Sequence, residues 1–292
     1  MNRIMRLAAV AALALGVCAC CGKSDKKCHA QKDCDGTCKS AVLQGTRGSD
    51  DFKVGVAGYT FRKFTIDETL AFLKEMGVHN LSVKDFWLPL DASSEQMDAF
   101  KAKCAEYEVD PYILGPIYMK SREAVDAAFD YVARFGHKMF IGVPNYELLD
   151  YTIAKVKETG IKIAIHTHGP DSMPFPNIKE IVDRVQDPSL GVGCCLDMGH
   201  AVRYGDDLVG DIIAYKDWIY DIHIKDETSA DKSGRTWEMG RGVMNFKAIV
   251  CALRSIDYKG CISVEFEKNA EAPALGVAES VGYLRAALDF TK

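Results

Sequence analysis

The stretches LGVGCCLDMGH (residues 190–200) and WIYDIHIKD (residues 218–226) decide the fold of this chain and locate its chemistry. Each begins as a short apolar run, which is typical of a buried strand, and ends in carboxylate and imidazole side chains. The polar residues at the two ends are Asp197, His200, His223 and Asp226. Any one of them alone would be expected to be a cap, a turn residue or a hydrogen-bonded histidine. Four at matched strand ends predict a site, because parallel α/β sheets place their chemistry beyond the carboxyl ends of their strands.

Short apolar runs alternate with amphipathic stretches on both sides of this region. The predicted strands cover residues 52–58, 79–83, 111–117, 138–143, 161–166, 190–196, 219–224 and 261–266. Helix-period segments lie between them, among them residues 67–77, 94–108, 121–136, 146–160 and 245–260. Several open on a capping Asp, Ser or Asn and are expected to close on Gly77, Gly136, Gly160 or Gly260.

The strict alternation predicts parallel strands with helices outside. Eight strand–helix units over residues 52–292 match the roughly 250 residues of a (β/α)8 TIM barrel, an α/β fold of one domain. The alternative is a doubly wound open sheet, which would favour a glycine-rich phosphate turn after the first strand. The sequence there, GVAGYTF (residues 55–61), contains neither GxGxxG nor GKS or GKT, so nucleotide binding is not favoured.

Composition is that of an ordinary globular protein. The 292 residues are 48% hydrophobic and 26% charged, with a formal net charge of -5. No basic cluster interleaved with aromatic residues follows the first 50 residues, so we expect no nucleic-acid partner and a small-molecule substrate.

Residues 1–20 have the pattern of a secretory signal peptide. Arg3 and Arg6 flank the start of the apolar run LAAVAALALGV, which is too short to span a bilayer and ends in small residues. The segment resembles a bacterial lipoprotein signal with Cys20 as the lipidated residue; Cys18 or Cys21 as acceptor and a plain cleaved signal are the alternatives. We therefore expect an exported protein that contacts a membrane only through a lipid anchor.

Residues 21–51 are rich in Lys, Asp, Ser, Gly and Cys and hold almost no large apolar side chain, so we expect a disordered tether. Its cysteines include Cys28, Cys34 and Cys38. Their spacing lacks the second CxxC pair of a zinc ribbon, so local disulfides or free thiols are expected.

A divalent-metal site is predicted at the carboxyl ends of the last four strands. His166, Asp197, His223 and Glu265 occupy the equivalent final position of predicted strands five to eight, so a closed barrel would direct one nitrogen or oxygen of each toward a shared centre. Two imidazoles and two carboxylates suit Mn²⁺, Zn²⁺, Co²⁺ or Fe²⁺ better than Mg²⁺ or Ca²⁺, which prefer oxygen ligands only.

Five segments resemble a known family in their order and spacing. They are IAIHTHGP (163–170), LDMGH (196–200), HIKD (223–226), the glycine pair Gly240 and Gly242 in MGRGVMNF, and YKGCISVEFE (258–267). Together they resemble the xylose isomerase-like TIM barrels, a superfamily of sugar isomerases and epimerases that also contains AP endonuclease family 2. The resemblance covers about residues 52–290.

The resemblance implies a metal held by four side chains. Asp197, His223 and Glu265 match three of the family's ligands, the aspartate of LDxGH, the histidine before KD and the glutamate of the last strand. The family's glutamate at the end of strand five is replaced by His166, which still has a metal-binding nitrogen. His168 matches a family histidine that supports the metal or faces the substrate. The implied cofactor is Mn²⁺, Zn²⁺ or Co²⁺.

The replaced glutamate bears on the reaction. Ketose epimerases of the family use two metal-bound glutamates on opposite sides of one carbon, and this chain lacks one of them. We expect a metal-dependent isomerase or epimerase that forms an enediolate on a keto-sugar, with Glu265, His200 or His168 moving the proton. The alternatives are a lyase or hydratase of 3-keto-glycosides and a non-catalytic sugar-binding lipoprotein. The DNA-binding endonuclease branch is disfavoured by the acidic charge and the expected export.

Residues near the mouth are expected to contact the sugar. Trp87, Tyr118 and Trp237 are candidates for stacking on a sugar ring, although each would be equally ordinary as a core or rim residue. Lys84 and Lys225 are candidates for polarising a sugar oxygen. An ion pair between Lys225 and Asp226 is the alternative for that lysine. The oligomeric state is left open.

Overall fold

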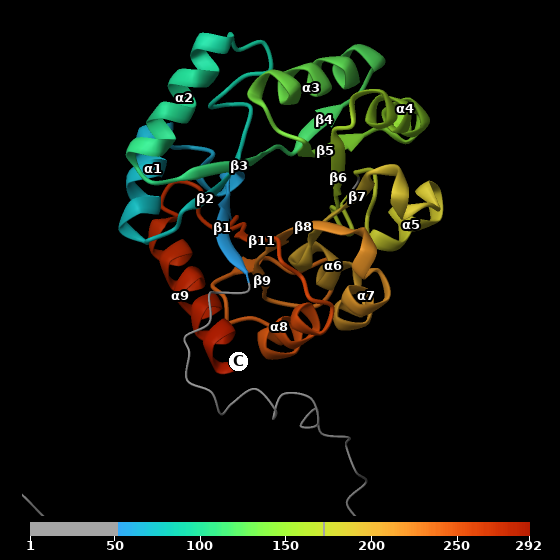
Figure 1. Cartoon of the computed structure of the whole chain (residues 1–292). Helices are drawn as coiled ribbons and strands as arrows, with labels where there is room; N and C mark the ends of the chain where they lie inside the picture. The colour runs from blue at the N-terminus through green and yellow to red at the C-terminus, as the bar shows by residue number, and fades with distance from the viewer. Residues whose placement is uncertain (1–51, 172) are drawn as a thin grey trace, which may run out of the picture. The chain divides into compact units, whose positions relative to one another are not determined.

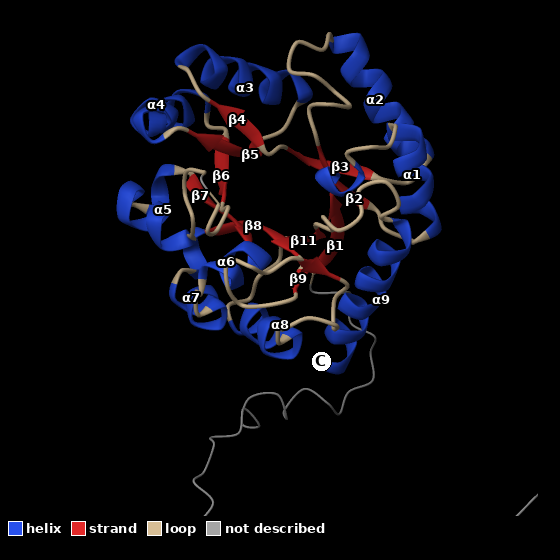
Figure 2. Ribbon diagram, turned by 180° about the vertical axis from the view of Figure 1, so that it is seen from behind, coloured by secondary structure: helices blue, strands red, loops and turns tan. Residues whose placement is uncertain are grey.

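The computed structural model describes residues 52–171 and 173–292. The predicted signal peptide (1–20) and tether (21–51) lie outside these residues. Figures 1 and 2 show the described part from opposite sides: the strands line the centre and the helices form a ring around them.

Nine parallel strands form one sheet in the order β3-β2-β1-β11-β8-β7-β6-β5-β4. They are β1 (Lys53–Ala57), β2 (Asn80–Val83), β3 (Asp110–Leu114), β4 (Ile117–Met119), β5 (Met139–Pro144), β6 (Lys162–His166), β7 (Val192–Asp197), β8 (Ile219–Ile224) and β11 (Cys261–Val264). A separate two-stranded ladder joins β9 (Asp226–Glu227) and β10 (Thr236–Trp237). The sheet is nearly closed on itself, and the predicted (β/α)8 barrel is confirmed.

The α-helices of the described residues are α1 (Ile66–Glu75), α2 (Ser94–Glu106), α3 (Arg122–Phe135), α4 (Leu149–Thr159), α5 (Ile178–Val185), α6 (Met198–Tyr204), α7 (Leu208–Ala214), α8 (Phe246–Ser255) and α9 (Ala274–Phe290). Short 3-10 helices cover η2 (Gly58–Phe61), η3 (Tyr146–Leu148), η4 (Pro188–Leu190) and η5 (Lys216–Trp218). None of these helices is long and apolar enough to cross a membrane.

The predicted third strand, residues 111–117, is divided into β3 and β4. Between them lie Gly115 and Pro116, and proline has no N–H to donate to a ladder. A Cβ on Gly115, which has a φ of +122°, would lie 2.1 Å from the Ile141 carbonyl oxygen of β5. The glycine therefore lets the backbone pass close to β5 at the point where the sheet nearly closes.

Local sequence explains most helix ends. Thr65 and Glu68 form a capping box at the start of α1, and Gly136 and Gly160 end α3 and α4 in the left-handed conformation, as predicted. Gly260 does not end a helix, because α8 stops at Ser255. The segment between β7 and β8 holds two helices, α6 and α7, since α6 ends at the left-handed Gly205.

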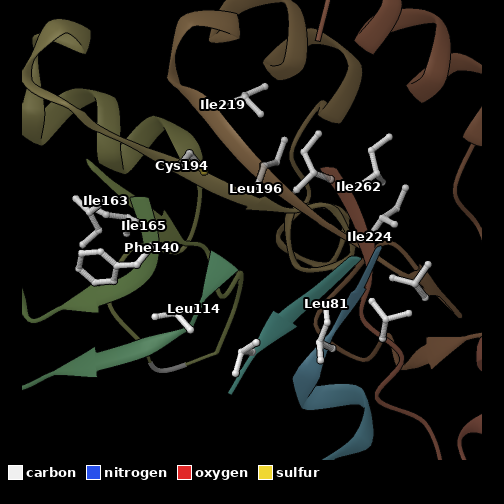
Figure 3. Packing of buried hydrophobic residues seen from close by; sticks show 14 of the residues in the cluster. Leu81, Leu114, Phe140, Ile163, Ile165, Cys194, Leu196, Ile219, Ile224 and Ile262 are labelled. Atoms are coloured by element: carbon white, nitrogen blue, oxygen red, sulfur yellow. The ribbon is translucent and has the colours of Figure 1, made fainter. Parts of the chain in front are cut away.

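Apolar side chains pack on both sides of the strands. Figure 3 shows part of the large core, in which Cys194 and Leu196 of β7 lie among the residues packed between sheet and helices. A small second cluster inside the barrel comprises Ile113, Ile141, Ala164 and Cys195. Since successive strand residues face opposite sides, Cys195 and Asp197 both point into the barrel.

Candidate active site

Four buried side chains converge at the carboxyl end of the barrel. One ligand atom from each of His166, Asp197, His223 and Glu265 lies within 4.8 Å of the others. His166 and Asp197 end β6 and β7, His223 is the penultimate residue of β8, and Glu265 follows β11 directly. The register of the sheet aligns them, because Asp197 lies opposite His223.

The geometry of this cluster fits a metal ion. His166 Nε2 lies 3.1 Å from His223 Nδ1 and 3.6 Å from Asp197 Oδ2, and His223 Nδ1 lies 3.2 Å from Glu265 Oε1. A tetrahedral ion about 2.0–2.2 Å from nitrogen and oxygen ligands separates them from one another by about 3.3–3.6 Å. The second nitrogens, His166 Nδ1 and His223 Nε2, are buried without a hydrogen-bond partner among the described residues. The two imidazoles and two carboxylates can therefore hold a divalent cation.

The ammonium group of Lys225 is the positive charge that pairs with the carboxylates of this cluster. The Lys225 side chain is 1% exposed, and Nζ donates to Asp197 Oδ2 and Glu265 Oε2, each at 2.8 Å, and to Glu267. When all three carboxyls are ionised, the ammonium leaves two negative charges in the cluster. That charge complements a divalent cation.

Burial and neighbouring charges set the pKa values of the titratable groups in this cluster. Burial holds the pKa of His166 well below its usual range, and the neighbouring His168 and His223 add to the effect, so His166 is neutral and able to ligate. Burial disfavours protonation of His223, but the adjacent Glu265 outweighs it and raises the pKa of His223. Burial would raise the pKa of Glu265 too, yet Lys225 and His223 hold it well below its usual value. Burial raises the pKa of Asp197, against the effect of Lys225.

The LDMGH segment serves this centre through its backbone as well as its side chains. Asp197 Oδ1 accepts the His200 N–H at 2.9 Å and caps α6, which leaves Oδ2 for Lys225. A Cβ on Gly199 would lie 2.4 Å from Lys225 Cγ. The glycine therefore makes room for the lysine beneath the first turn of α6.

Asp226 has a structural role. Its Oδ2 accepts the amides of Gly240 and Gly242, each at 2.9 Å, and its Oδ1 accepts those of Glu227 and Met244. A Cβ on Gly242 would lie 2.4 Å from Asp226 Oδ1. Asp226 thus fixes the loop before α8. It forms no ion pair with Lys225, which pairs with Asp197, Glu265 and Glu267 instead.

Two further predicted histidines border the centre. His168 Nε2 lies 3.2 Å from the Tyr118 hydroxyl, and burial lowers the pKa of His168 to about 4. His200 lies between two cations, with Nδ1 3.2 Å from Arg203 and Nε2 3.3 Å from Lys225. A neutral imidazole accepts at one nitrogen only, so His200 cannot accept from both donors. A rearrangement of Lys225 would free Nε2 of His200.

The predicted sugar-contacting residues are spread around the mouth and beyond it. Tyr118 is 42% exposed and contacts His168, and Lys84, whose Nζ donates to the Pro116 carbonyl at 2.5 Å, lies 5.6 Å from the Tyr118 ring centre. Trp237 lies under Lys268, 3.9 Å from ring centre to Nζ. Trp87 lines a groove with residues of α1 and α2, and its Nε1 donates to the Phe64 carbonyl. Their contact with a substrate stays a prediction.

Three residues of the site were given no role from the sequence. Glu267 lies with His200 and Glu265 in a group whose ligand atoms are within 4.8 Å of one another, and Arg203 contacts His200. Glu227 is 1% exposed, one of its oxygens has no partner among the described residues, and burial raises its pKa to about 7. The signal for Glu267 and Glu227 is the two-residue period, which places them on the same side as Glu265 and His223.

Several known proteins share this fold over most of the chain. A sugar phosphate isomerase/epimerase from Parabacteroides distasonis is 20% identical, covers 85% of this chain and 98% of its own, and superimposes with a TM-score of 0.62. The 3-keto-D-glucoside 4-epimerase of E. coli is 18% identical over 80% of this chain and 99% of its own, with a TM-score of 0.64. An L-ribulose 3-epimerase is 13% identical over 82% of this chain and 95% of its own, with a TM-score of 0.63.

No curated protein matches the sequence. The sequence model of the xylose isomerase-like TIM barrel family matches residues 70–287, which is most of the chain. Because that match runs through the strands carrying His166, Asp197, His223 and Glu265, the chain belongs to the xylose isomerase-like TIM barrel family.

Proposed function

We propose that this protein is a divalent-metal-dependent sugar isomerase or epimerase that acts on a keto-sugar through an enediolate. The observation that carries the proposal is the convergence of His166, Asp197, His223 and Glu265 at the open end of the barrel. The names of two proteins with the same fold, an L-ribulose 3-epimerase and a 3-keto-D-glucoside 4-epimerase, support the class of reaction.

The four converging residues would hold the ion, which when bound supplies Lewis-acid polarisation of adjacent carbonyl and hydroxyl oxygens. Lys225 holds Glu265 and Glu267 in fixed positions through its ammonium. Glu265 is ionised, because Lys225 and His223 hold its pKa low despite its burial, so it is in the unprotonated form that a general base requires. Neutral His168 and His200 border the same space and can exchange protons with sugar oxygens.

Glu267 is a second carboxylate of the site, beside Glu265. The family's epimerases use two carboxylates, and the sequence offers none at the end of strand five. The structure places the Glu267 carboxylate within 4.8 Å of ligand atoms of Glu265 and His200, and its side chain is 30% exposed. We infer that Glu267 adds a carboxylate on the same side of the site as Glu265, which suits proton transfer on one face of an enediolate, as in isomerisation, and leaves the opposite face without a glutamate of the described residues.

The test compares two changes at His166. His166→Ala should weaken Mn²⁺ binding by at least about 10- to 100-fold, because a ligand is lost. His166→Glu should restore Mn²⁺ binding and keep or raise epimerisation of a ketose. Calorimetric titration with Mn²⁺ and turnover assays on free ketoses and 3-keto-glycosides measure both. His79→Ala, at an exposed histidine, is the matched control.

Three outcomes would contradict the proposal. Unchanged Mn²⁺ affinity in His166→Ala would show that His166 is a packed histidine and no ligand. Elimination or hydration products from 3-keto-glycosides, formed without any epimer and lost in His166→Glu, would identify a lyase or hydratase. Sugar binding without turnover in any divalent metal would identify a sugar-binding protein.

A further inference from the structure

A charged pocket of about 560 Å³ adjoins the candidate active site. Its charged lining residues are Asp171, Arg203, Lys232, Arg235, Glu267 and Lys268. They follow β6, β7, β8 and β11, the four strands that carry the metal-binding residues. The pocket therefore lies at the carboxyl end of the barrel, on the side of the candidate centre.

Glu267 belongs to both the pocket and the centre. It lines the pocket, and its Oε1 accepts from Lys225 Nζ, which also donates to Asp197 and Glu265. A group bound in the pocket would consequently lie one side chain away from the metal-binding carboxylates. A substituent of the molecule that reacts at the centre could therefore reach the pocket.

Part of the pocket's charge is internally paired. Arg203 binds Asp171 through both terminal nitrogens, at 3.3 and 3.4 Å, and Lys268 binds the two oxygens of Glu238 at 2.8 and 2.9 Å. Glu267 is paired with Lys225. These three pairs leave no net charge on the residues they involve.

Two positively charged side chains of the pocket, Lys232 and Arg235, have no carboxylate partner among the described residues. Arg235 Nη1 donates to the backbone carbonyls of Ser233 at 2.9 Å and Gly234 at 2.8 Å, and Lys232 is exposed. Neither forms an ion pair with any residue in the described ranges 52–171 and 173–292. The pocket thus has two net positive charges on a chain whose net charge is -5.

The loop that carries these cations is well ordered by its own hydrogen bonds. Thr228 and Arg235 exchange two bonds, from the Thr228 amide at 2.9 Å and to the Thr228 hydroxyl at 3.0 Å. A Cβ on Gly234 would lie 2.9 Å from Arg203 Cγ, so the loop backbone packs directly on that side chain. The Arg235 backbone is therefore fixed by hydrogen bonds, and its exposed side chain lines the pocket.

We propose that this pocket binds the anionic group of an acidic sugar, a carboxylate or a phosphate, and so selects the substrate of the neighbouring centre. The proposal rests on the proposed function. Guanidinium groups recognise carboxylate and phosphate with paired hydrogen bonds, and Lys232 adds a second positive charge. Arg235 is the principal anion-binding residue.

The experiment compares charged and neutral probes of the same size class. Calorimetric titrations with D-glucuronate and D-glucose test the carboxylate, and titrations with D-fructose 6-phosphate and D-fructose test the phosphate. At least one acidic probe should bind 10-fold or more tightly than its neutral counterpart, and the preferred probe identifies the group. Arg235→Gln should weaken its binding by about 10-fold and Lys232→Gln by less, because lysine gives a single-point contact. Neutral sugars should bind the variants and the unchanged protein equally.

Lys247→Gln, which removes one exposed positive charge from α8, is the matched control for net charge. Equal binding of acidic and neutral probes, or equal effects of Arg235→Gln and Lys247→Gln, would overturn the inference. Turnover of neutral ketoses with no preference for acidic ones would overturn it while the proposed function stands. Arg235-dependent binding of an acidic sugar without turnover in any metal would overturn the proposed function and leave the pocket assignment standing.

Discussion

The barrel contains two buried polar layers, one above the other, built from the same three strands. The upper layer contains a buried lysine, and the lower layer contains no lysine or arginine of residues 52–171 and 173–292. The upper layer includes Asp197, His223 and Glu265. The lower layer includes the residues two positions earlier, Cys195, Asp221 and Ser263, together with Tyr112 of β3. Because strand side chains alternate between faces, a step of two residues keeps each pair on the inside of the barrel.

Within the part of the chain that the structure describes, the lower layer is a hydrogen-bonded network without a lysine or arginine. The Tyr112 hydroxyl lies 3.1 and 3.2 Å from the two Asp221 oxygens and 2.8 Å from Ser263 Oγ. No lysine or arginine of the described residues forms an ion pair with Asp221, and burial raises its pKa to about 7. The upper layer instead holds three carboxylates around Lys225. Burial raises the pKa of Asp221, and of Asp197 despite Lys225, whereas Lys225 and His223 hold the pKa of Glu265 well below its usual value. The upper layer therefore differs from the lower one in having a buried cation and an ionised carboxylate, the charges that suit the proposed metal.

The largest expected effect is that of Lys225→Met, which removes the cation and keeps a side chain of similar length. Breaking a buried ion pair by removing one partner costs about 3–5 kcal/mol, so the metal-free variant should lose that much unfolding free energy. Mn²⁺ should recover most of the loss, because it neutralises the same carboxylates. Its affinity should rise by at least about 10-fold, since one positive neighbour is gone. Urea unfolding with EDTA and with Mn²⁺ measures both effects.

Lys84→Met is the control for this prediction. Lys84 is also buried, 6% exposed, but its carboxylate partner Asp85 at 3.2 Å is 42% exposed and distinct from the metal-binding group. The added Mn²⁺ should stabilise Lys84→Met and the unchanged protein equally. If Mn²⁺ stabilised Lys225→Met no more than the unchanged protein, Lys225 and the metal would not share the carboxylates of the upper layer.

The second effect is pH-dependent and belongs to the lower layer. The pKa of Asp221 rises on folding from its ordinary 3.8 to about 7. Between these values the folded state binds more protons than the unfolded state, so this residue lowers the unfolding free energy as pH rises from about 4 to 7, by up to about 4 kcal/mol. Asp221→Asn should therefore match the unchanged metal-free protein at pH 4 and exceed it by up to that amount at pH 8. Urea unfolding across this range measures the difference.

Asp91→Asn, at an exposed aspartate, is the control for Asp221→Asn. Its difference from the unchanged protein should be small and constant with pH. A difference for Asp221→Asn that is also constant with pH would mean that Asp221 is ionised in the folded protein, and the contrast between the two layers would be lost.

The sequence predicted the upper layer far better than the lower one. His166, Asp197, His223 and Glu265 end apolar runs, and polar residues at strand ends stand out against their neighbours. Asp221 and Ser263 lie within apolar runs, and only a barrel with a known inside and outside makes them adjacent to Tyr112. The role of Lys225 was hidden for a related reason, since its partners Asp197, Glu265 and Glu267 are 28 to 42 residues away in the sequence.

The smallest effect concerns the hydroxyl that joins the members of the lower layer. Tyr112→Phe removes the donor to Asp221 and the partner of Ser263 Oγ, and one unsatisfied buried polar group costs about 1–3 kcal/mol. The Tyr112 hydrogen bond opposes the effect of burial on Asp221 by lowering its pKa, so the loss of unfolding free energy should be larger at pH 8 than at pH 4. Combined with Asp221→Asn, the pH dependence should disappear. Mn²⁺ affinity should stay unchanged, because Tyr112 contacts none of the four metal-binding side chains in any hydrogen bond of the described residues. A fall in Mn²⁺ affinity as large as that of His166→Ala would show that the two layers act as one site.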